Sequence, residues 1–106
     1  MNAQPERPIA RVGDRTLGGG TLFAIAGPCV LESIDLAVSI AEELHEICAS
    51  MDIPLLFKSS FDKANRTSAT AGRGPGFEQG LEWLHEVRER VGVQVLTAVH
   101  QPEQCA

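Results

Sequence analysis

The sequence predicts an α/β fold with a parallel β-sheet. Three short apolar runs alternate along the chain with two longer stretches in which apolar residues recur at helical spacing. The apolar runs lack the strict alternation of a half-exposed strand, which indicates strands that are covered on both faces. A strand–helix–strand–helix–strand order with such strands implies right-handed crossovers between parallel neighbours.

The first twenty residues are expected to form an extension or a hairpin ahead of this sheet. They are mostly polar and contain three successive glycines, Gly18 to Gly20. Within them, Ile9 to Val12 could form a short strand or one arm of a hairpin. The glycines do not precede a helix, so they do not indicate a nucleotide-binding loop.

The first strand of the sheet is predicted at Thr21 to Ala26 (TLFAIA), an apolar run that ends at Gly27 and Pro28. Ser33 is a suitable N-cap for the helix that follows, from about Ile34 to Ala49. The helix is expected to bury the apolar residues that share one face, namely Leu36, Ile40, Leu44, Ile47 and Cys48.

The second half of the chain repeats this pattern. Ile53 to Phe57 (IPLLF) is predicted as a second buried strand, and Val93 to Ala98 (VQVLTA) as a third. Between them, a second helix is expected from near Pro75 to about Val91, because proline is well tolerated in a first helical turn. Its apolar face is formed by Phe77, Leu81, Leu84, Val87 and Val91.

Length and composition exclude several classes of protein. The 106 residues are 43% hydrophobic, which is enough apolar material for the core of one domain. A net charge of −5 argues against nucleic acid or an anionic membrane as the partner. The longest apolar run, Leu22 to Leu31, is too short to cross a bilayer, and the N-terminus has no apolar core of a secretory signal. Three widely spaced cysteines favour reduced thiols in a cytosol: Cys29, Cys48 and Cys105.

The segment from Lys58 to Arg73 (KSSFDKANRTSATAGR) has the composition of an anion-binding loop. It contains four cations and one acid, a local charge of +3 in a chain of net charge −5, together with Ser, Thr and Asn donors. A solvated basic loop would have the same composition. However, the segment follows a predicted parallel strand, as do Gly27 to Cys29 and Thr97 to His100. Because function gathers where parallel strands end, this shared position favours a binding site.

The predicted elements do not make a closed sheet. A doubly wound domain would contain about five strands, and a barrel needs eight strands and about 250 residues. We therefore expect residues 1–106 to be one incomplete domain. In this interpretation, residues 21–106 form the first βα units, and residues 1–20 form the N-terminal extension or hairpin.

Four motifs resemble the family of 3-deoxy-D-manno-octulosonate 8-phosphate synthases in order and spacing. They are IAGPCVLES (25–33), FKSSFDKANRTS (57–68), RGPGFEQGL (73–81) and VLTAVHQPEQ (95–104). The related heptulosonate 7-phosphate synthases share the GPC-type first strand, but their second loop reads more like KPRTSP. The second motif therefore favours the octulosonate family, with a heptulosonate or sialic-acid-type synthase as the alternative.

The resemblance implies a fold and a function. The fold is a (β/α)8 TIM barrel, of which this chain would be the N-terminal portion. The family enzymes are transferases that condense phosphoenolpyruvate with D-arabinose 5-phosphate and release phosphate, a step of lipopolysaccharide synthesis. They are cytoplasmic and usually homotetrameric. Both substrates are anions, which a basic loop would attract.

The resemblance also assigns roles to individual residues. It implies that Lys58 and Lys63 contact phosphoenolpyruvate, and that Ser60 belongs to the same substrate-binding loop. Asn65, Arg66 and Thr67 correspond to residues that hold the sugar phosphate. Lysine supplies a point charge and arginine a two-pronged donor for phosphate oxygens.

The resemblance also implies roles for Cys29 and His100. By itself, a single Cys at the end of a buried strand is more often a small core residue than a ligand. In the family, members with Cys at this position use a divalent metal and members with Asn do not, so Cys29 implies the metal-dependent class. The other metal ligands of that class lie on later strands, so residues 1–106 alone should hold no tight metal. His100 lies at the active-site face and is the expected catalytic residue, although an exposed loop His would look the same.

The last motif departs from the family. The usual TDVHEP is TAVHQP here, so Ala98 replaces an active-site Asp and Gln101 replaces a Glu. An Ala cannot orient a substrate hydroxyl or assist a proton transfer. The sequence therefore leaves two hypotheses: a metal-dependent synthase whose residues 1–106 are inactive alone, and a non-catalytic remnant that binds a small anion.

Overall fold

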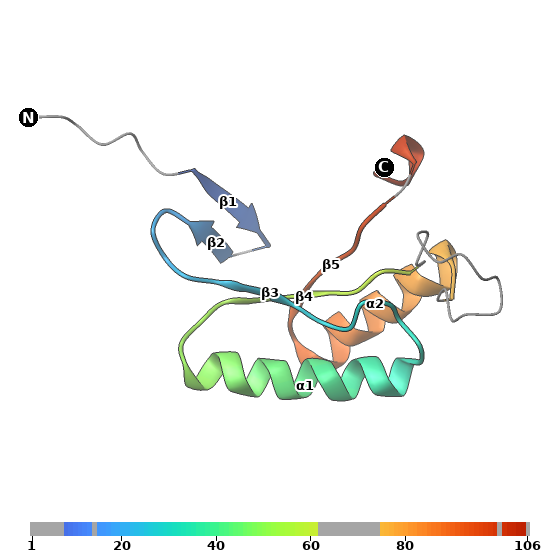
Figure 1. The fold of residues 1–106 in the computed structure, drawn as a ribbon, viewed down its shortest axis with the longest axis horizontal. Helices are drawn as coiled ribbons and strands as arrows, with labels where there is room; N and C mark the ends of the chain where they lie inside the picture. Colours follow the sequence, from blue (N-terminus) through green and yellow to red (C-terminus); the bar gives the residue numbers. More distant parts are fainter. Residues whose placement is uncertain (1–7, 14, 62–74, 100, 106) are drawn as a thin grey trace, which may run out of the picture.

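The computed structural model describes residues 8–13, 15–61, 75–99 and 101–105. Its centre is a three-stranded parallel sheet in which β4 (Leu55–Lys58) lies between β3 (Ala24–Ala26) and β5 (Gln94–Leu96). Helix α1 (Ile34–Ser50) connects β3 to β4, and α2 (Phe77–Val91) connects β4 to β5 (Figure 1). The predicted βαβαβ order and the parallel sheet are therefore confirmed. A 3₁₀ turn, η1 (Pro102–Cys105), follows.

The N-terminal residues form the hairpin that the sequence indicated. Strand β1 (Ile9–Val12) pairs antiparallel with β2 (Arg15–Gly18), with Ile9 opposite Gly18. The turn between the two strands approaches the start of β5, because a Cβ on Gly13 would overlap the side-chain amide of Gln94. The hairpin thus lies toward the amino ends of the parallel strands, away from the end where Lys58 lies.

Both helices pack on the same face of the sheet. One cluster of buried residues joins the helices to alternate positions of the strands. Its members from α1 and α2 are Ala37, Val38, Ala41, Cys48, Leu84 and Val87; its members from the strands and their ends are Leu55, Phe57 and Val93. Ala24, Ala26 and Val95 pack against this cluster from the two outer strands. Because consecutive strands are neighbours and both crossovers lie on one face, each new strand is added at the same edge of the sheet.

The buried face of α1 differs from the predicted one. Cys48 is buried and Ile40 and Leu44 pack against the core, as expected, but Leu36 and Ile47 are 44% and 55% exposed. The helix instead turns Ala37, Val38 and Ala41 toward the sheet. Small side chains let the helix approach the strands closely, and close packing outweighs the larger apolar area of Leu and Ile at these positions.

The strands are shorter than predicted and are not covered on both faces. Strand β3 begins at Ala24 rather than Thr21, and Ile25 on its uncovered face is 49% exposed. In the central strand, Leu56 on that same face is buried, at 4% exposure, because β3 and β5 flank it. The prediction of strands buried on both faces is therefore wrong for β3. The two helices cover one face of the sheet, and Ile25 lies on the opposite face.

The other strand ends also shift. Strand β4 begins at Leu55 rather than Ile53, and it includes Lys58. Pro54 has no N–H to give to a ladder, although its carbonyl accepts a hydrogen bond from the Ala24 N–H at 2.9 Å. Strand β5 covers Gln94–Leu96, which is shorter than the predicted range of Val93 to Ala98.

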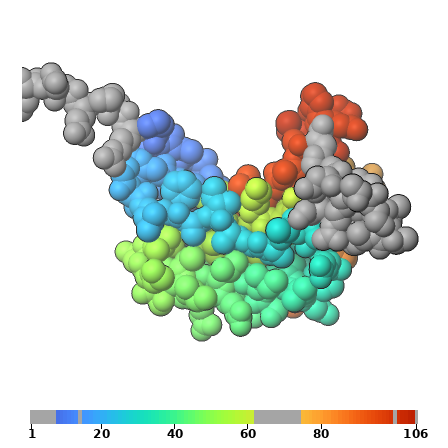
Figure 2. All heavy atoms as spheres, viewed as in Figure 1, coloured from blue at the N-terminus to red at the C-terminus, as the bar shows by residue number. Residues whose placement is uncertain are grey.

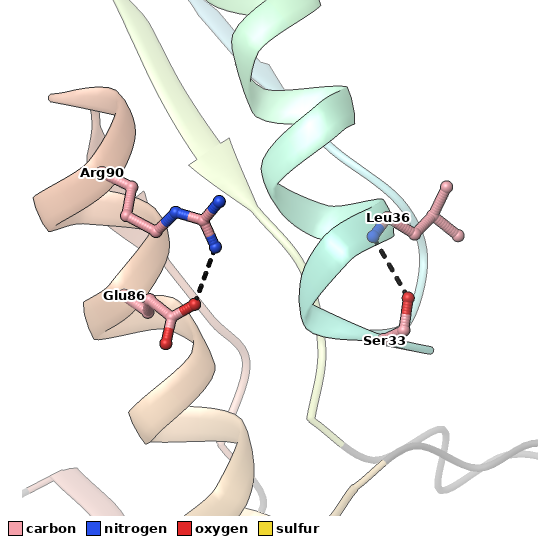
Figure 3. A network of polar contacts seen from close by, with 4 residues as sticks. All are labelled: Ser33, Leu36, Glu86 and Arg90. Atoms are coloured by element: carbon pink, nitrogen blue, oxygen red, sulfur yellow. Dashed lines mark hydrogen bonds and ion pairs between the residues drawn. The ribbon is translucent and has the colours of Figure 1, made fainter.

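The helix ends follow ordinary capping chemistry. The Ser33 hydroxyl accepts a hydrogen bond from the Leu36 N–H at 3.1 Å, which confirms the predicted N-cap of α1 (Figure 3). Helix α2 begins at Phe77, two residues after Pro75 and so near the predicted start, because Gly76 with φ of 91° does not have a helical backbone. Its last turns carry an exposed ion pair of 3.0 Å between Glu86 and Arg90 (Figure 3). Neither helix of the described residues is long and apolar enough to cross a membrane.

Candidate functional site

The carboxyl end of the parallel sheet brings the loop after β3 against the end of β4. A Cβ on Gly27 would overlap the carbonyl oxygen of Lys58, so only glycine allows the two backbones to lie this close. The contact places Cys29, two residues further along, next to the residues that follow Lys58. Glycine is therefore required here for close approach and not for a nucleotide-binding turn.

Ser59 joins the ends of all three parallel strands. Its side chain is buried, at 1% exposure, and its Oγ donates a hydrogen bond of 2.8 Å to the carbonyl oxygen of Pro28, which follows β3. Its backbone N–H donates a hydrogen bond of 3.2 Å to the carbonyl oxygen of Leu96, the last residue of β5. Ser59 was not among the predicted site residues, because a Ser beside a functional Lys looks like one more loop donor until its burial is known.

The contact between the two loops continues past Ser59. The Ser60 N–H donates to the Cys29 carbonyl at 3.2 Å, and the Leu31 N–H donates to the Ser60 carbonyl at 2.9 Å. Val30 and Ser60 form an isolated parallel bridge. The loop that carries Cys29 therefore runs beside the loop that carries Ser60 as a short extension of the sheet.

Three of the predicted site residues meet at this edge. Lys58 and Cys29 are exposed, and Ser60 is half-buried. Their backbones are held by the hydrogen bonds described above, while the ammonium of Lys58 is available to an anion in solvent. In Figure 2, the sheet residues around β4 (yellow-green) reach the surface between the hairpin (blue) and the C-terminal residues (red). The remaining predicted site residues lie outside the described part of the chain: Lys63, Asn65, Arg66, Thr67 and His100.

The described residues on either side of positions 62–74 contact one another. The Gly76 N–H donates a hydrogen bond of 3.0 Å to the Phe61 carbonyl. The rings of Phe61 and Phe77 meet edge to face, with centroids 5.3 Å apart and an interplanar angle of 76°. Gly80 on α2 lies against Phe61 so closely that a Cβ would overlap the Cβ of Phe61. Phe61 and Gly76, the described neighbours of positions 62–74, are therefore held close to each other.

Thr97 and Ala98 follow β5 at the same edge. Ala98 is half-buried. The Thr97 Oγ1 is buried, and it has no hydrogen-bond partner among the described residues. A buried hydroxyl without a partner is costly, so Thr97 is a second polar residue at this edge whose surroundings the sequence could not predict.

Within the described residues, too few metal-ligating side chains surround Cys29 to form a metal centre. No three His, Cys, Asp or Glu side chains of residues 8–13, 15–61, 75–99 and 101–105 lie together in a way that could hold a metal ion. A closed zinc-type site needs about four ligands and an open one about three. Among the described residues, Cys29 therefore has no cluster of ligands around it, and this edge does not fit a metal by itself.

Known proteins resemble this chain over most of its length. The 2-dehydro-3-deoxyphosphooctonate aldolase of Legionella pneumophila (strain Corby) is 56% identical over 80 residues, which cover 76% of this chain and 29% of the relative. The protein of the same name in Syntrophobacter fumaroxidans is 54% identical over 86 residues, 81% of this chain and 30% of the relative. That of Trichlorobacter lovleyi is 50% identical over 96 residues, 90% of this chain and 35% of the relative.

These relatives confirm the resemblance that the four sequence motifs indicated. The chain spans about a third of the length of the curated relatives it matches. The model of the DAHP synthetase I family matches residues 5–106, which is nearly the whole chain. The chain therefore belongs to the DAHP synthetase I family.

Proposed function

We propose that this protein takes part in the condensation of phosphoenolpyruvate with D-arabinose 5-phosphate, which yields 3-deoxy-D-manno-octulosonate 8-phosphate and phosphate. The observation that supports this most strongly is the 50% to 56% identity to three proteins named 2-dehydro-3-deoxyphosphooctonate aldolase. The anion-binding composition of residues 58–73, next to the edge where Cys29 and Lys58 meet, supports the same class of substrate.

The proposal includes a (β/α)8 barrel as the complete fold. In the described residues, each strand of the parallel sheet pairs with the next one along the chain, and both connecting helices lie on one face. A doubly wound sheet would differ from this arrangement only in later strands, where its strand order reverses and helices cover the second face. Continued repetition of the observed unit curls a sheet into a barrel, with the active site at the carboxyl ends of the strands.

Within that fold, the basic segment is the substrate-binding loop. Lys58 and Lys63 would neutralise the charge of phosphoenolpyruvate, with Ser60 as a neutral donor beside them. The sugar phosphate would be held by Asn65, Arg66 and Thr67, of which arginine can donate two parallel hydrogen bonds to phosphate oxygens. His100 would lie next to the reacting groups. The protein would act in the cytoplasm, as a homotetramer.

Cys29 is proposed as one ligand of a divalent metal in the complete site. Its exposed thiol lies beside the strand end that carries Lys58, where a ligand could reach both. The other ligands of the metal-dependent class have no counterpart in residues 1–106, so the metal would not bind tightly to these residues alone.

A second function is favoured by the two missing carboxylates. Ala98 and Gln101 stand where the family has Asp and Glu, and Ala98 is half-buried at the site edge. An Ala there removes a group that could orient a hydroxyl or move a proton, while the cations for anion binding are retained. The protein would then bind phosphorylated anions without turning them over.

The decisive experiment transfers residues 21–105 into the Legionella pneumophila relative in place of its matching segment. If the proposed function is right, the hybrid releases phosphate from phosphoenolpyruvate only when arabinose 5-phosphate is present. Replacement of Ala98 with Asp and of Gln101 with Glu should then raise kcat, because both restore a carboxylate.

Three outcomes separate the alternatives. A hybrid that binds phosphoenolpyruvate but gains activity only after Ala98→Asp supports the non-catalytic function for the natural sequence. A hybrid that accepts a four-carbon sugar phosphate in preference to arabinose 5-phosphate indicates a heptulosonate synthase. A hybrid that stays folded and binds neither substrate, even after both replacements, contradicts the proposed function.

A further inference from the structure

The carboxyl edge of the sheet is held together at one buried residue. Ser59 lies between exposed Lys58 and half-buried Ser60, but its own side chain is only 1% exposed. A side chain at that depth cannot reach a ligand in solvent. Its two hydrogen bonds instead run sideways within the sheet, from Oγ to the Pro28 carbonyl at 2.8 Å and from N–H to the Leu96 carbonyl at 3.2 Å.

Pro28 makes the side-chain bond particularly important. Because proline has no N–H, the backbone of Pro28 can form a hydrogen bond only through its carbonyl oxygen. The Ser59 Oγ donates to that carbonyl. The next carbonyl along the loop, that of Cys29, accepts a hydrogen bond of 3.2 Å from the Ser60 N–H. The two bonds fix successive carbonyls of the loop that carries Cys29, relative to the strand end that carries Lys58.

We infer that Ser59 is a positioning residue whose hydroxyl sets the spacing between Cys29 and Lys58. The biological role of this spacing rests on the proposed function, because that function uses both Cys29 and Lys58. The spacing itself can be tested without measuring catalytic turnover. Removal of the hydroxyl leaves the Pro28 carbonyl without this donor and frees the loop after β3. The net value of one such hydrogen bond corresponds to about a fivefold change in an equilibrium constant.

The three cysteines of the chain provide the measurement. Cys29 is exposed on the loop in question, Cys48 is buried in the core between α1 and the sheet, and Cys105 is exposed in η1. The full chain and its Ser59→Ala variant are treated with iodoacetamide, and alkylation of each cysteine is followed by peptide mass spectrometry. The rate at Cys29 is divided by the rate at Cys105, which corrects for differences in iodoacetamide concentration between samples.

In the Ser59→Ala variant, we expect this ratio to rise by about fivefold, because a loosened loop samples more conformations in which the thiol can be attacked. The rate at Cys48 should not change. A Cys29 ratio within experimental error of the wild type overturns the inference. A rise at Cys48 in step with Cys29 overturns it as well, because it shows that Ser59 holds the core and not the loop.

Ser50→Ala is the matched control. The Ser50 hydroxyl also donates to a backbone carbonyl, that of Ile47 at 2.7 Å, but it does so at the exposed end of α1. This variant loses the same chemical group and the same kind of hydrogen bond. Alkylation of Cys29 should stay at the wild-type rate, and an increase equal to that of Ser59→Ala would contradict the inference.

Repeating the measurement with phosphoenolpyruvate separates this inference from the proposed function. Protection of Cys29 by phosphoenolpyruvate in the wild-type chain supports the function, and loss of that protection in Ser59→Ala supports both. If the ligand has no effect but Ser59→Ala still raises the Cys29 ratio, the positioning role stands and the function loses support. If the ligand protects both chains equally and the ratio is unchanged, the function stands and the positioning role is wrong.

Discussion

Gly27 and Lys58 lie backbone to backbone at the carboxyl edge of the sheet, with no room between them for a Cβ on Gly27. This contact brings the loop after β3 beside the loop after β4. It thereby places an exposed thiol and an exposed ammonium, from residues far apart in the chain, at the same edge. The site therefore depends on the absence of a side chain as much as on the presence of charged ones.

Gly27→Ala should disrupt this edge. The new methyl group must displace the Lys58 carbonyl, and forced overpacking of this kind costs about 1–3 kcal/mol. We expect a lower free energy of unfolding, measured by urea with the fluorescence of Trp83, which packs against the core. Binding of phosphoenolpyruvate should weaken as well.

Gly92→Ala is the control for that variant. Gly92 has a φ of 84° at the C-cap of α2, and a Cβ there would meet open space. The substitution should cost about 1 kcal/mol through backbone strain and leave ligand binding unchanged. Equal loss of binding in the two variants would show that the Gly27 contact does not position the site.

Gly80→Ala should destabilise the protein, against the usual effect of this change in a helix. Ala normally stabilises a helix interior by about 1 kcal/mol relative to Gly. Here the methyl group would overlap the Cβ of Phe61, which is only 2% exposed. Glu89→Ala on the exposed side of α2 is the control and should change the free energy of unfolding by less than about 0.5 kcal/mol. A more stable Gly80→Ala variant would contradict the observed packing of α2 on Phe61.

Ser33→Ala should lower the free energy of unfolding by about 1 kcal/mol, because it removes the N-cap hydrogen bond to Leu36. Ser39→Ala, on the exposed surface of the same helix, should be neutral or slightly stabilising, since Ala is the better helix former. The difference between the two variants, measured by urea unfolding, isolates the cap. Equal values would show that the cap contributes nothing measurable.

Lys58→Met should weaken the binding of phosphoenolpyruvate by about tenfold or more, which is the value of a hydrogen bond to a charged group. Lys58→Arg retains the positive charge and should bind more tightly than the Met variant. Arg88→Met is the matched control, because it removes one exposed cation from α2 and leaves the site edge intact. Titration calorimetry gives the dissociation constants, and equal weakening in the Lys58 and Arg88 variants would indicate a general charge effect.

The sequence was a good guide to the order of elements and to their approximate ends. Apolar runs and helical spacing predicted the parallel strands and both helices, and Ser33 marked the start of α1 correctly. It was a poor guide to which face is buried. Leu36 and Ile47 looked like core residues but are exposed, because the small residues Ala37 and Ala41 allow closer packing on the sheet.

For the site, the sequence determined which chemical groups are present, and the tertiary structure determined which of them meet. Charge and motif indicated Cys29, Lys58 and Ser60 as site residues, because their chemistry is visible residue by residue. The roles of Gly27 and Ser59 were not visible, since one acts by close backbone contact and the other by a buried hydrogen bond to a distant carbonyl. Those contacts join residues about thirty positions apart, and local sequence carries no signal for them until the parallel strands are paired.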